Sequence, residues 1–411
     1  MDPSEHSSIL IVGAGHCGGR SAQYLREFGF AGRIDLVGNE PSFPYERPPL
    51  SKDVLIGTKC LDELDFMTSQ AMKKLALTRH FASVLSIDTA SNSAQLSTGE
   101  RVGYGALLFA NGGRPRRLYI PGGDLPGVLT LRGKEDALRL ADRLKLGQHI
   151  VIIGGGFIGL EVAASARKLN CKVTLFERGS QLMSRAVPSP IAERVKVLHE
   201  SKGVRLYSNV SPTHITQDGD KLALDMSNGT TVVADTVVLG IGIEPSVEIA
   251  RTAGVRVARG ILVDSQLRTN VANIFAAGDI AEFQSSISGA LMRQETWQNA
   301  ESQARVVAQN LIGGHVTHTE KPWFWSDQYD YQLQVSGEPS AGVNSVVREL
   351  DEGDLIIFYL DDNSRIVGAC GWGLTVRIAR ELKIARVLVE RDTFASAEVL
   401  ANPSTRLKSL L

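Results

Sequence analysis

The sequence contains few cysteines, and their positions exclude several kinds of site. Cys17, Cys60, Cys171 and Cys370 stand far apart, with no C-x-x-C pair and no metal-ligand spacing. The sequence therefore predicts unpaired thiols, no metal site and a location in the reducing cytoplasm. The same spacing leaves no ligand set for an iron–sulfur cluster within the chain.

Long apolar runs and an excess of charge are missing as well. No apolar run reaches the roughly 18 residues of a membrane helix, and the first eight residues, MDPSEHSS, lack the basic and apolar regions of a signal peptide. The formal net charge is −1, so nothing global attracts the chain to nucleic acid or to anionic lipid. At 411 residues the chain is too long for one compact core, and we expect two or three domains.

Glycine, by contrast, is abundant, with 40 residues in a chain of 411. Two groups of glycines follow the same pattern, ILIVGAGHCGGRSAQ starting at Ile9 and IVIIGGGFIGLEVAA starting at Ile150. Each pattern joins an apolar run, typical of a buried parallel strand, to G-x-G-x-x-G and then to a segment with helical spacing. The sequence therefore predicts two nucleotide-binding units.

The fold class we expect is α/β, with two Rossmann-like dinucleotide-binding domains and a C-terminal α+β domain. We expect residues 1–113 and 245–320 to form the first of these domains, into which the second, 114–244, is inserted. From residue 321 to 411, PWFWSDQYDYQLQV and the alternating segments LIIFYL and RIVGACGW predict an antiparallel sheet. The segment VRIARELKIARVLVE then predicts a helix.

Each glycine of such a fingerprint has its own role. The first makes a tight turn, the second lets the backbone approach a pyrophosphate, and the third lets helix and strand pack closely. The phosphates lie at the helix N-terminus, where the N–H groups favour negative charge. Because the pattern occurs twice, we expect two dinucleotides to bind at once. The two sets are Gly13, Gly15 and Gly18, and Gly154, Gly156 and Gly159.

Acidic residues indicate which dinucleotides these are. Glu177 ends the second strand of the second unit, in VTLFER, where a carboxylate accepts hydrogen bonds from a ribose diol and repels a 2′-phosphate. We therefore expect NADH rather than NADPH, although the neighbouring Arg178 could tolerate that phosphate. The segment NIFAAGDIAEF, which contains Asp279, resembles the second FAD fingerprint of flavoproteins that bind two dinucleotides. We therefore expect the domain of residues 1–113 and 245–320 to bind FAD and that of residues 114–244 to bind NADH.

With these motifs the sequence resembles the FAD-dependent, NADH-using ferredoxin reductases of bacterial oxygenase systems, which include the biphenyl-dioxygenase-type, putidaredoxin and rubredoxin reductases. The resemblance spans the chain and includes PYERPPLSK at 44–52, LRGKEDA at 131–137, GIGIEPS at 240–246, AAGDI at 276–280, ETWQNA at 295–300 and PWFWSDQY at 322–329. It implies hydride transfer from NADH to flavin N5, then single electrons to a [2Fe–2S] ferredoxin that feeds a ring-hydroxylating dioxygenase or a P450 oxygenase.

The resemblance also implies the site residues. Lys52 is expected beside the flavin N5 edge and paired with Glu161, and these two are the predicted catalytic residues. Trp297 is expected near the isoalloxazine. The residues implied to bind the cofactors are Gly13, Gly15, Cys17, Gly18, Asn39, Glu40, Arg47, Pro48, Lys52, Val84, Ala110, Gly112, Arg132, Asp279, Glu295, Thr296, Trp297, Trp325, Gly154, Gly156, Phe157, Ile158, Gly159, Glu161, Glu177 and Gly242.

Three positions depart from the family pattern. The usual ribose acid of the first unit is replaced by Asn39, so either FAD binding is weaker or Glu40 substitutes for it. The usual A-T-G before the basic loop reads Ala110-Asn111-Gly112, which is a tolerable change. Cys17 occupies a fingerprint position that is often small and apolar, and we expect a packed thiol there.

The expected electron acceptor is a separate protein, because the chain cannot hold a cluster itself. Ferredoxins are typically acidic, so we expect a basic docking face despite the near-zero net charge. The candidates are Arg305, Arg380, Lys383 and Arg386. We expect no nucleic-acid or membrane partner, and either a monomer or a homodimer.

Other functions stay open. A flavin disulfide reductase or a peroxide-reducing NADH oxidase needs a redox cysteine near the end of the first unit, where NEPSFPYERPPLSK has none. A monodehydroascorbate-type reductase shares the fold and uses a small-molecule radical. A flavoprotein like apoptosis-inducing factor, which senses NADH, shares RPPLSK, but nucleic-acid binding needs a basic surface that a net charge of −1 does not indicate.

Overall fold

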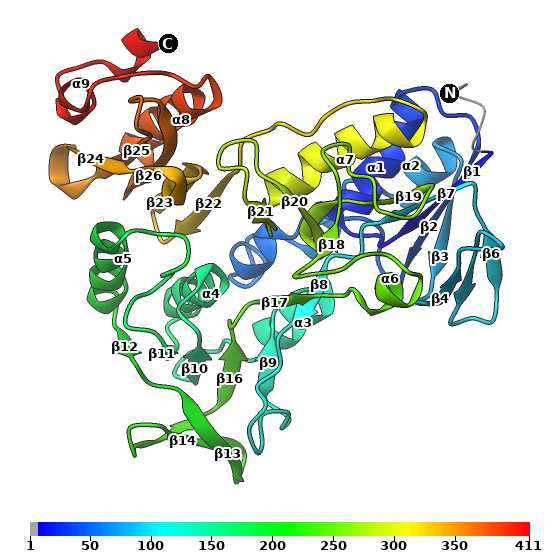
Figure 1. Ribbon diagram of the computed structural model, residues 1–411. Coiled ribbons are helices and arrows are strands. Elements are labelled where there is room, and N and C mark those ends of the chain that lie inside the picture. Colours follow the sequence, from blue (N-terminus) through cyan, green and yellow to red (C-terminus); the bar gives the residue numbers. More distant parts are fainter. Residues whose placement is uncertain (1–6) are drawn as a thin grey trace. The chain divides into compact units, whose positions relative to one another are not determined.

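The computed structural model describes residues 7–411, which form two compact units (Figure 1). Of the described residues, unit 1 consists of 7–46, Leu64–Arg114 and Glu244–Phe324, and unit 2 of Arg47–Glu63, Pro115–Ile243 and Trp325–Leu411. Most of the segment in which we expect no signal peptide, residues 1–6, lies outside the described residues.

Unit 1 is built on a five-stranded parallel sheet with the order β19-β7-β1-β2-β3. The side chains of β1 alternate between its two faces, so that Ile9 and Ile11 belong to one apolar core and Leu10 and Val12 to another. Two helices, α1 and α7, pack against each other beside the first of these cores (Figure 1). The bounds are β1 Ser8–Val12, α1 His16–Glu27, β2 Arg33–Gly38, β3 Leu77–Phe81, β7 Ala106–Phe109, β19 Ile274–Ala276 and α7 Trp297–Leu311.

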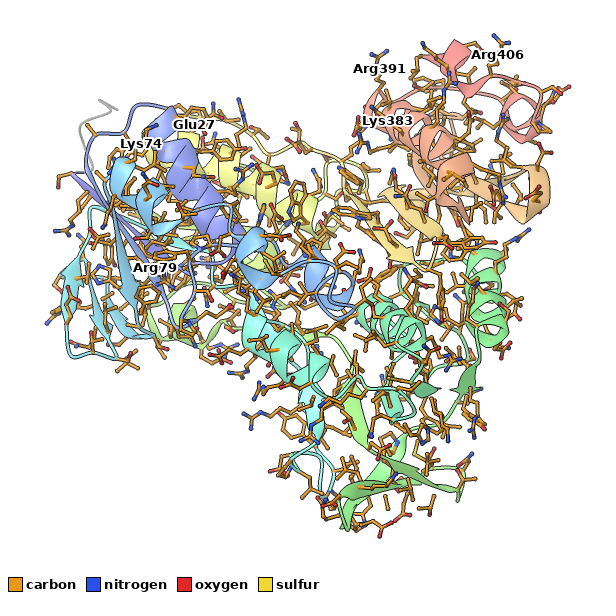
Figure 2. All side chains as sticks on the ribbon, turned by 180° about the vertical axis from the view of Figure 1, so that it is seen from behind. Glu27, Lys74, Arg79, Lys383, Arg391 and Arg406 are labelled. Carbon is orange, nitrogen blue, oxygen red and sulfur yellow. The ribbon has the colours of Figure 1, made fainter. Side chains whose placement is uncertain are left out.

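Shorter elements surround this sheet. Charged residues at two helix ends, Glu27 on α1 and Lys74 on α2, are exposed (Figure 2). The strands β4, β5 and β6 form an antiparallel sheet, and β18, β20 and β21 form another small sheet. The bounds are α2 Ser69–Lys74, β4 Val84–Asp88, β5 Ser93–Leu96, β6 Arg101–Gly103, α6 Glu248–Thr252, β18 Ile261–Leu262, η3 Gly278–Ile280, β20 Ala281–Gln284 and β21 Leu291–Met292.

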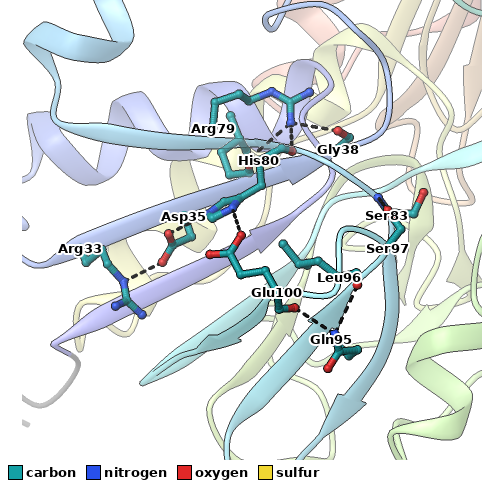
Figure 3. Close-up of polar contacts among 11 residues, drawn as sticks. Arg33, Asp35, Gly38, Arg79, His80, Ser83, Gln95, Leu96, Ser97 and Glu100 are labelled. Carbon is teal, nitrogen blue, oxygen red and sulfur yellow. Dashed lines mark hydrogen bonds and ion pairs between the residues drawn. The ribbon is translucent and has the colours of Figure 1, made fainter.

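A polar network fixes β3 beside β2 (Figure 3). The carboxylate of Asp35, which is 3% exposed, lies 2.8 Å from Arg33 Nε and 3.0 Å from His80 Nε2. The other ring nitrogen of His80, Nδ1, lies 3.2 Å from Glu100 Oε2. His80 is therefore enclosed by two carboxylates in a purely structural setting.

Unit 2 contains a second parallel sheet, with the order β12-β11-β10-β16-β9. Beside it lies the antiparallel sheet β13-β14-β15, whose apolar residues share a core with β10 and β16. The bounds are η1 Pro48–Ser51, η2 Leu61–Leu64, β9 Val128–Thr130, α3 Lys134–Ala141, β10 His149–Ile153, α4 Phe157–Lys168, β11 Lys172–Glu177, α5 Ser189–Ser201, β12 Val204–Ser208, β13 Pro212–Asp218, β14 Lys221–Met226, β15 Thr231–Ala234 and β16 Thr236–Leu239.

The C-terminal part of unit 2 is an antiparallel sheet with the order β22-β23-β26-β25-β24. Ile378 and Leu382 of the helix α8 pack into a core with Ile356 and Phe358 of the sheet. The bounds are β22 Trp323–Gln328, β23 Tyr331–Gly337, η4 Pro339–Ala341, β24 Asn344–Glu349, η5 Asp351–Gly353, β25 Leu355–Leu360, β26 Ile366–Leu374, α8 Thr375–Glu390, α9 Ala397–Ala401 and η6 Leu407–Leu410. The chain passes between the units after Glu46 and then within η2, β8 Gly113–Pro115, β17 Ile243–Pro245 and β22.

The predicted α/β fold class is confirmed, with two parallel five-stranded sheets and an antiparallel C-terminal sheet. The division into three domains stays a prediction. All four cysteines are free, and no helix within residues 7–411 is long and apolar enough to cross a membrane. Over the same residues no group of His, Cys, Asp and Glu side chains has the arrangement of a metal site.

Candidate functional site

The first glycine fingerprint turns the chain from β1 into α1. Gly13 has a φ of +113°, and a Cβ added there would lie 2.4 Å from the carbonyl of Ala110. A Cβ added to Gly18 would lie 1.8 Å from the carbonyl oxygen of Gly13, so only glycine lets the helix pack on the turn. Helix α1 begins after Gly15, and within the described residues its first turn has neither a capping side chain nor an acid. This end of α1 therefore fits the pyrophosphate of a dinucleotide.

The second fingerprint repeats this construction between β10 and α4. Gly154 has a φ of +107°, and an added Cβ would lie 2.6 Å from the carbonyl oxygen of Gly240. A Cβ on Gly159 would lie 2.1 Å from the carbonyl oxygen of Gly154. Helix α4 begins with Phe157 and Ile158, again with no capping side chain in the part of the chain that the structure describes. The nearby loop contains Gly242, whose φ is +94°. The residues of this end also fit a pyrophosphate.

Glu177 organises the second fingerprint. Its carboxylate lies at the end of β11, where Oε2 accepts a hydrogen bond of 2.7 Å from the backbone N–H of Gly155. Oε1 accepts another of 2.7 Å from the N–H of Gly179. Each carboxylate oxygen can accept more than one bond, so the group retains capacity for a ribose diol. The ribose-binding role of Glu177 stays a prediction.

An arginine, not an acid, organises the corresponding loop of the first fold. The guanidinium of Arg79 donates to the carbonyls of Gly38 at 3.0 Å, Glu40 at 3.1 Å and Ser42 at 3.3 Å (Figure 3 shows the first). Burial lowers the pKa of Arg79 to about 10, with Glu40 opposing the change. Asn39 is exposed, and Glu40 accepts a hydrogen bond of 2.5 Å from the Tyr45 hydroxyl. Sequence reasoning missed Arg79, because a single cation in LTRHF matches no motif.

The AAGDI segment lies against the first fingerprint. Gly278, with a φ of +78°, lies so close to Cys17 that an added Cβ would approach its Sγ to 3.2 Å. The N–H of Gly278 donates to the side-chain oxygen of Gln303 at 2.8 Å, and Asp279 follows in η3. Cys17 is 6% exposed, and burial, assisted by the charge of Asp279, raises the pKa of its thiol. Cys17 is therefore a packed, protonated thiol.

The remaining predicted residues of unit 1 lie near strand ends and at the start of α7. Thr296 caps α7 by accepting a hydrogen bond of 3.1 Å from the N–H of Asn299, and Trp297 is the first helical residue. Glu295 is exposed and paired with Arg293 at 2.6 Å. The other positions are Val84 and Ala110, which are buried, and Gly112, which has a φ of +56°.

In unit 2 the structure brings Lys52 and Glu161 together. Lys52 directly follows η1, and its Nζ lies 3.3 Å from Glu161 Oε1 and 3.3 Å from Asp327 Oδ2. Glu161 is 6% exposed and accepts hydrogen bonds from the hydroxyls of Ser51 at 2.5 Å and Ser326 at 2.6 Å. The lysine thus lies between two carboxylates, one of which is fixed by two serines.

The charges of this cluster oppose its burial. Burial acts to lower the pKa of Lys52, but the charges of Glu161 and Asp327 outweigh it, so that the pKa is raised. The pKa of Glu161 is raised by burial, although Lys52 and the two serine hydroxyls act against that rise. Lys52 therefore keeps its proton at neutral pH, next to a carboxylate removed from water.

Other predicted residues of unit 2 surround this cluster. The indole of Trp325 donates to Asp327 Oδ2 at 3.1 Å, and its ring centroid lies 6.0 Å from Lys52 Nζ. Arg47, which precedes Pro48, donates to the carbonyl of Arg132 at 2.6 Å. Sequence reasoning missed Ser51, Ser326 and Asp327 as partners. They stand inside RPPLSK and PWFWSDQY, so polar residues within the most specific motifs were the available signal.

Comparisons with known proteins show which family the chain belongs to. The family described as "Pyridine nucleotide-disulphide oxidoreductase" matches residues 7–304, and "Reductase C-terminal" matches residues 323–411. The ferredoxin–NAD(+) reductase component of the p-cumate 2,3-dioxygenase system of Pseudomonas putida is 37% identical, over 98% of each chain. The corresponding component of the biphenyl dioxygenase system of Paraburkholderia xenovorans is 34% identical, again over 98% of each.

Solved structures give the same result. The ferredoxin reductase for the CYP199A2 system of Rhodopseudomonas palustris has a TM-score of 0.93 and 36% identity, over 98% of this chain and 99% of that one. Putidaredoxin reductase in its covalent complex with putidaredoxin also has a TM-score of 0.93, at 31% identity over 98% and 97%. The family predicted from the sequence is confirmed: the chain belongs to the pyridine nucleotide-disulphide oxidoreductases, among the ferredoxin–NAD(+) reductases of oxygenase systems.

Proposed function

We propose that the protein takes electrons from NADH and delivers them one at a time to a [2Fe–2S] ferredoxin that serves an oxygenase. The observation that best supports this function is the Lys52–Glu161–Asp327 cluster in a chain with two glycine fingerprints. FAD, when bound, supplies the chemistry that accepts two electrons together and releases them singly. The protein supplies binding, orientation and charge.

The residues of the cluster have distinct tasks in this proposal. Lys52 keeps its proton and so provides a fixed positive charge, which favours a cofactor that becomes negative on reduction. The two serine hydroxyls hold the Glu161 carboxylate in one orientation, available to the carboxamide of NADH. Asp327 limits the positions that the lysine can adopt. No residue has to transfer a proton or form a covalent bond.

Each glycine fingerprint binds one of the two nucleotides in this proposal. We assign FAD to the first fold and NADH to the second. Glu177 favours the free ribose of NADH over the ribose of NADPH, because the 2′-phosphate of NADPH would place a second negative charge beside the carboxylate. One relative, from a Sphingomonas species, is named as a ferredoxin–NAD(P)(+) reductase, so preference within the group is a property of each chain.

Basic residues on each unit suit an acidic ferredoxin. In unit 1, the exposed Arg305 lies with its guanidinium 5.6 Å from the ring centroids of Tyr24 and of Phe28. In unit 2, Arg380 and Lys383 are exposed on α8 (Figure 2 labels Lys383). Arg386 is paired with Glu390 at 3.3 Å and so contributes less net charge. We propose these as docking residues of a monomer or homodimer that acts in the cytoplasm.

The test of the proposed function is anaerobic stopped-flow spectroscopy of the purified protein with NADH and then with oxidised ferredoxin. We expect flavin absorbance to bleach and ferredoxin to be reduced over many turnovers. In Lys52→Met we expect bleaching to slow about 100-fold, the scale of losing one charged group from a reactive site. A colourless protein, or a flavin that NADH leaves oxidised, would falsify the function. A reduced flavin that persists beside ferredoxin would favour an NADH sensor.

Lys59→Met is the matched control, because Lys59 follows Lys52 closely in the same segment and has no ion pair among residues 7–411. It should bleach at the wild-type rate. Equal slowing in both variants would mean that the segment, and not the Lys52 charge, matters.

The docking proposal has a separate test. Arg305→Glu should raise the KM for ferredoxin about tenfold through lost charge complementarity, and should leave the reduction of ferricyanide by NADH unchanged. Steady-state assays with both acceptors measure this. Equal losses in the two assays would exclude a docking role for Arg305.

A further inference from the structure

A histidine at the start of α1 is enclosed by two carboxylates. His16 is the first residue of α1 and is 8% exposed. Its Nε2 lies 2.8 Å from Glu301 Oε2, and its Nδ1 lies 3.6 Å from Glu46 Oε2. The glycine fingerprint does not require a histidine here, since its function depends on the backbone. The residue therefore needs another explanation.

The same histidine contacts Trp297. The indole Nε1–H of Trp297 donates to Glu46 Oε2, and the ring of His16 lies against the indole with centroids 5.1 Å apart at an interplanar angle of 48°. The ring of His16 also packs edge-on against the ring of Phe66, with centroids 5.2 Å apart. His16, Glu46 and Trp297 thus contact one another pairwise, which restricts the rotation of the indole.

A second contact fixes the helix that carries Trp297. Glu301 lies one turn after Trp297 on α7, and it accepts hydrogen bonds from three residues of α1: His16, Arg20 at 2.7 Å and Tyr24 at 2.6 Å. Burial acts to raise the pKa of Glu301, but these hydrogen bonds outweigh it and lower the pKa to about 2. Glu301 is therefore ionised at neutral pH and holds α7 to α1.

Packing alone does not account for His16. Its Nδ1 is buried and has no hydrogen-bond partner among residues 7–411. A buried ring nitrogen without a partner is destabilising, and a leucine or phenylalanine would fill the same space without that cost. The imidazole does what neither could, since it bonds to Glu301 on α7 while its ring lies against the indole and its other nitrogen faces Glu46.

We propose that His16 is a positioning residue, which holds the indole of Trp297 in one orientation at the FAD-binding fold. The inference rests on the proposed function, because it takes FAD to be the ligand of the first fingerprint. An indole fixed in one orientation quenches flavin emission uniformly and hinders the release of FAD on the side where the indole lies. An indole released from His16 adopts several rotamers, so that both effects weaken.

The test is a double-mutant cycle on the FAD-loaded protein with His16→Leu and Trp297→Phe. We expect His16→Leu to raise flavin fluorescence about threefold and the rate of FAD release about tenfold, within the range of coupling between residues in contact. In the Trp297→Phe background, His16→Leu should change neither quantity further. Time-resolved emission should show one flavin lifetime in the wild type and several in His16→Leu.

His80→Leu is the matched control. His80 is also enclosed by two carboxylates in unit 1, at 3.0 Å and 3.2 Å, but its partners are Asp35 and Glu100 and it has no tryptophan neighbour among the described aromatic contacts. It should lower the melting temperature as His16→Leu does, with unchanged flavin emission. If His16→Leu fails to fold, His16→Gln replaces it, because a glutamine amide can still donate to Glu301 but has no ring to lay against the indole.

The outcomes separate the two proposals. Flavin emission and FAD release that are unchanged in His16→Leu and His16→Gln, or effects that add to those of Trp297→Phe, overturn the positioning role while leaving the proposed function intact. A wild-type protein that binds no FAD overturns the proposed function itself. Non-additive effects confined to His16 support the inference.

Discussion

The two nucleotide-binding folds share their fingerprint and the order of four strands, β7-β1-β2-β3 in unit 1 and β16-β10-β11-β12 in unit 2, but opposite charges organise the loop after the second strand. In unit 2 the carboxylate of Glu177 binds the N–H groups of Gly155 and Gly179. In unit 1 the guanidinium of Arg79 binds the carbonyls of Gly38, Glu40 and Ser42. A carboxylate leaves lone pairs for a ribose diol, whereas a guanidinium has none to offer. Similar topology thus accommodates two solutions, and of these two groups only the carboxylate of Glu177 keeps acceptors that a ribose could use.

The first helices of the two folds also differ in what they bind. Helix α1 presents His16, Arg20 and Tyr24 to one carboxylate on α7. Helix α4 has mostly apolar buried residues, and its polar ones, Glu161 and Ser165, contact the segment around Ser51. Helix α1 is therefore fixed to its own fold by charge, while α4 uses its buried polar groups to organise the lysine cluster.

The largest effects should come from filling the close approach in each fingerprint. In Gly18→Ala the added Cβ would lie 1.8 Å from a backbone oxygen, and in Gly159→Ala 2.1 Å. Because backbone atoms cannot move aside cheaply, we expect Gly18→Ala to abolish retention of FAD, and Gly159→Ala to keep FAD but slow its reduction by NADH at least about 100-fold. Flavin absorbance and stopped-flow bleaching measure the two losses.

The control for these variants is Gly103→Ala, because the nearest atom to an added Cβ there is 3.9 Å away. It should bind FAD and react as the wild type does. Loss of FAD from Gly159→Ala, or retention of FAD by Gly18→Ala, would contradict the assignment of one nucleotide to each fold.

The next effect concerns the hydrogen bonds that join α1 to the ionised carboxylate of Glu301 on α7. The pKa of Glu301 is about 2 in the folded protein against 4.5 ordinarily, so ionised Glu301 stabilises the fold above pH 4.5. This stabilisation is lost as pH falls from 4.5 toward 2. The free energy of unfolding of Glu301→Gln should therefore be about 3 kcal/mol lower than that of the wild type at pH 7. This difference between wild type and variant should become smaller below pH 4.5. Urea titrations at several pH values measure it.

Ser165→Ala provides the comparison in the second fold, where the hydroxyl of Ser165 donates to the carbonyl of Ser51 at 2.7 Å. Its cost should be about 1 kcal/mol and independent of pH over the same range. A pH-independent gap for Glu301→Gln would show that its charge is not what binds α1 to α7.

The smallest effects should follow from single substitutions at Glu177 and Asn39, the two positions at which the sequence predicts contact with a ribose. Glu177→Ala should raise the KM for NADH about tenfold and reduce the preference over NADPH, since one charged acceptor is lost. Asn39→Asp should lower the dissociation constant of FAD only about threefold, because Arg79 already holds the loop. Steady-state kinetics and FAD titration of the apoprotein test both. An unchanged KM in Glu177→Ala would remove its role in recognition.

Local patterns explain how much of this structure could be predicted. The strand–glycine–helix units are encoded within about 30 residues each, so the sequence reveals both folds. Lys52 and Glu161 were paired by resemblance, not by spacing. No spacing rule could pair His16 with Glu301, because the two residues are 285 positions apart in the sequence. Nor could a spacing rule identify Arg79 as a hydrogen-bond donor to the backbone carbonyls of a loop. Contacts of this kind depend on which helices and loops meet, and that is a property of the assembled fold.

The distribution of the thiols has a practical consequence. Burial raises the pKa of Cys17, Cys171 and Cys370, whereas Cys60 is exposed on a loop of unit 2. Thiolates are the reactive species, so a maleimide dye or spin label should attach to the native protein at Cys60 alone. The natural sequence thus offers a single attachment point for a spectroscopic reporter, without removal of any other cysteine.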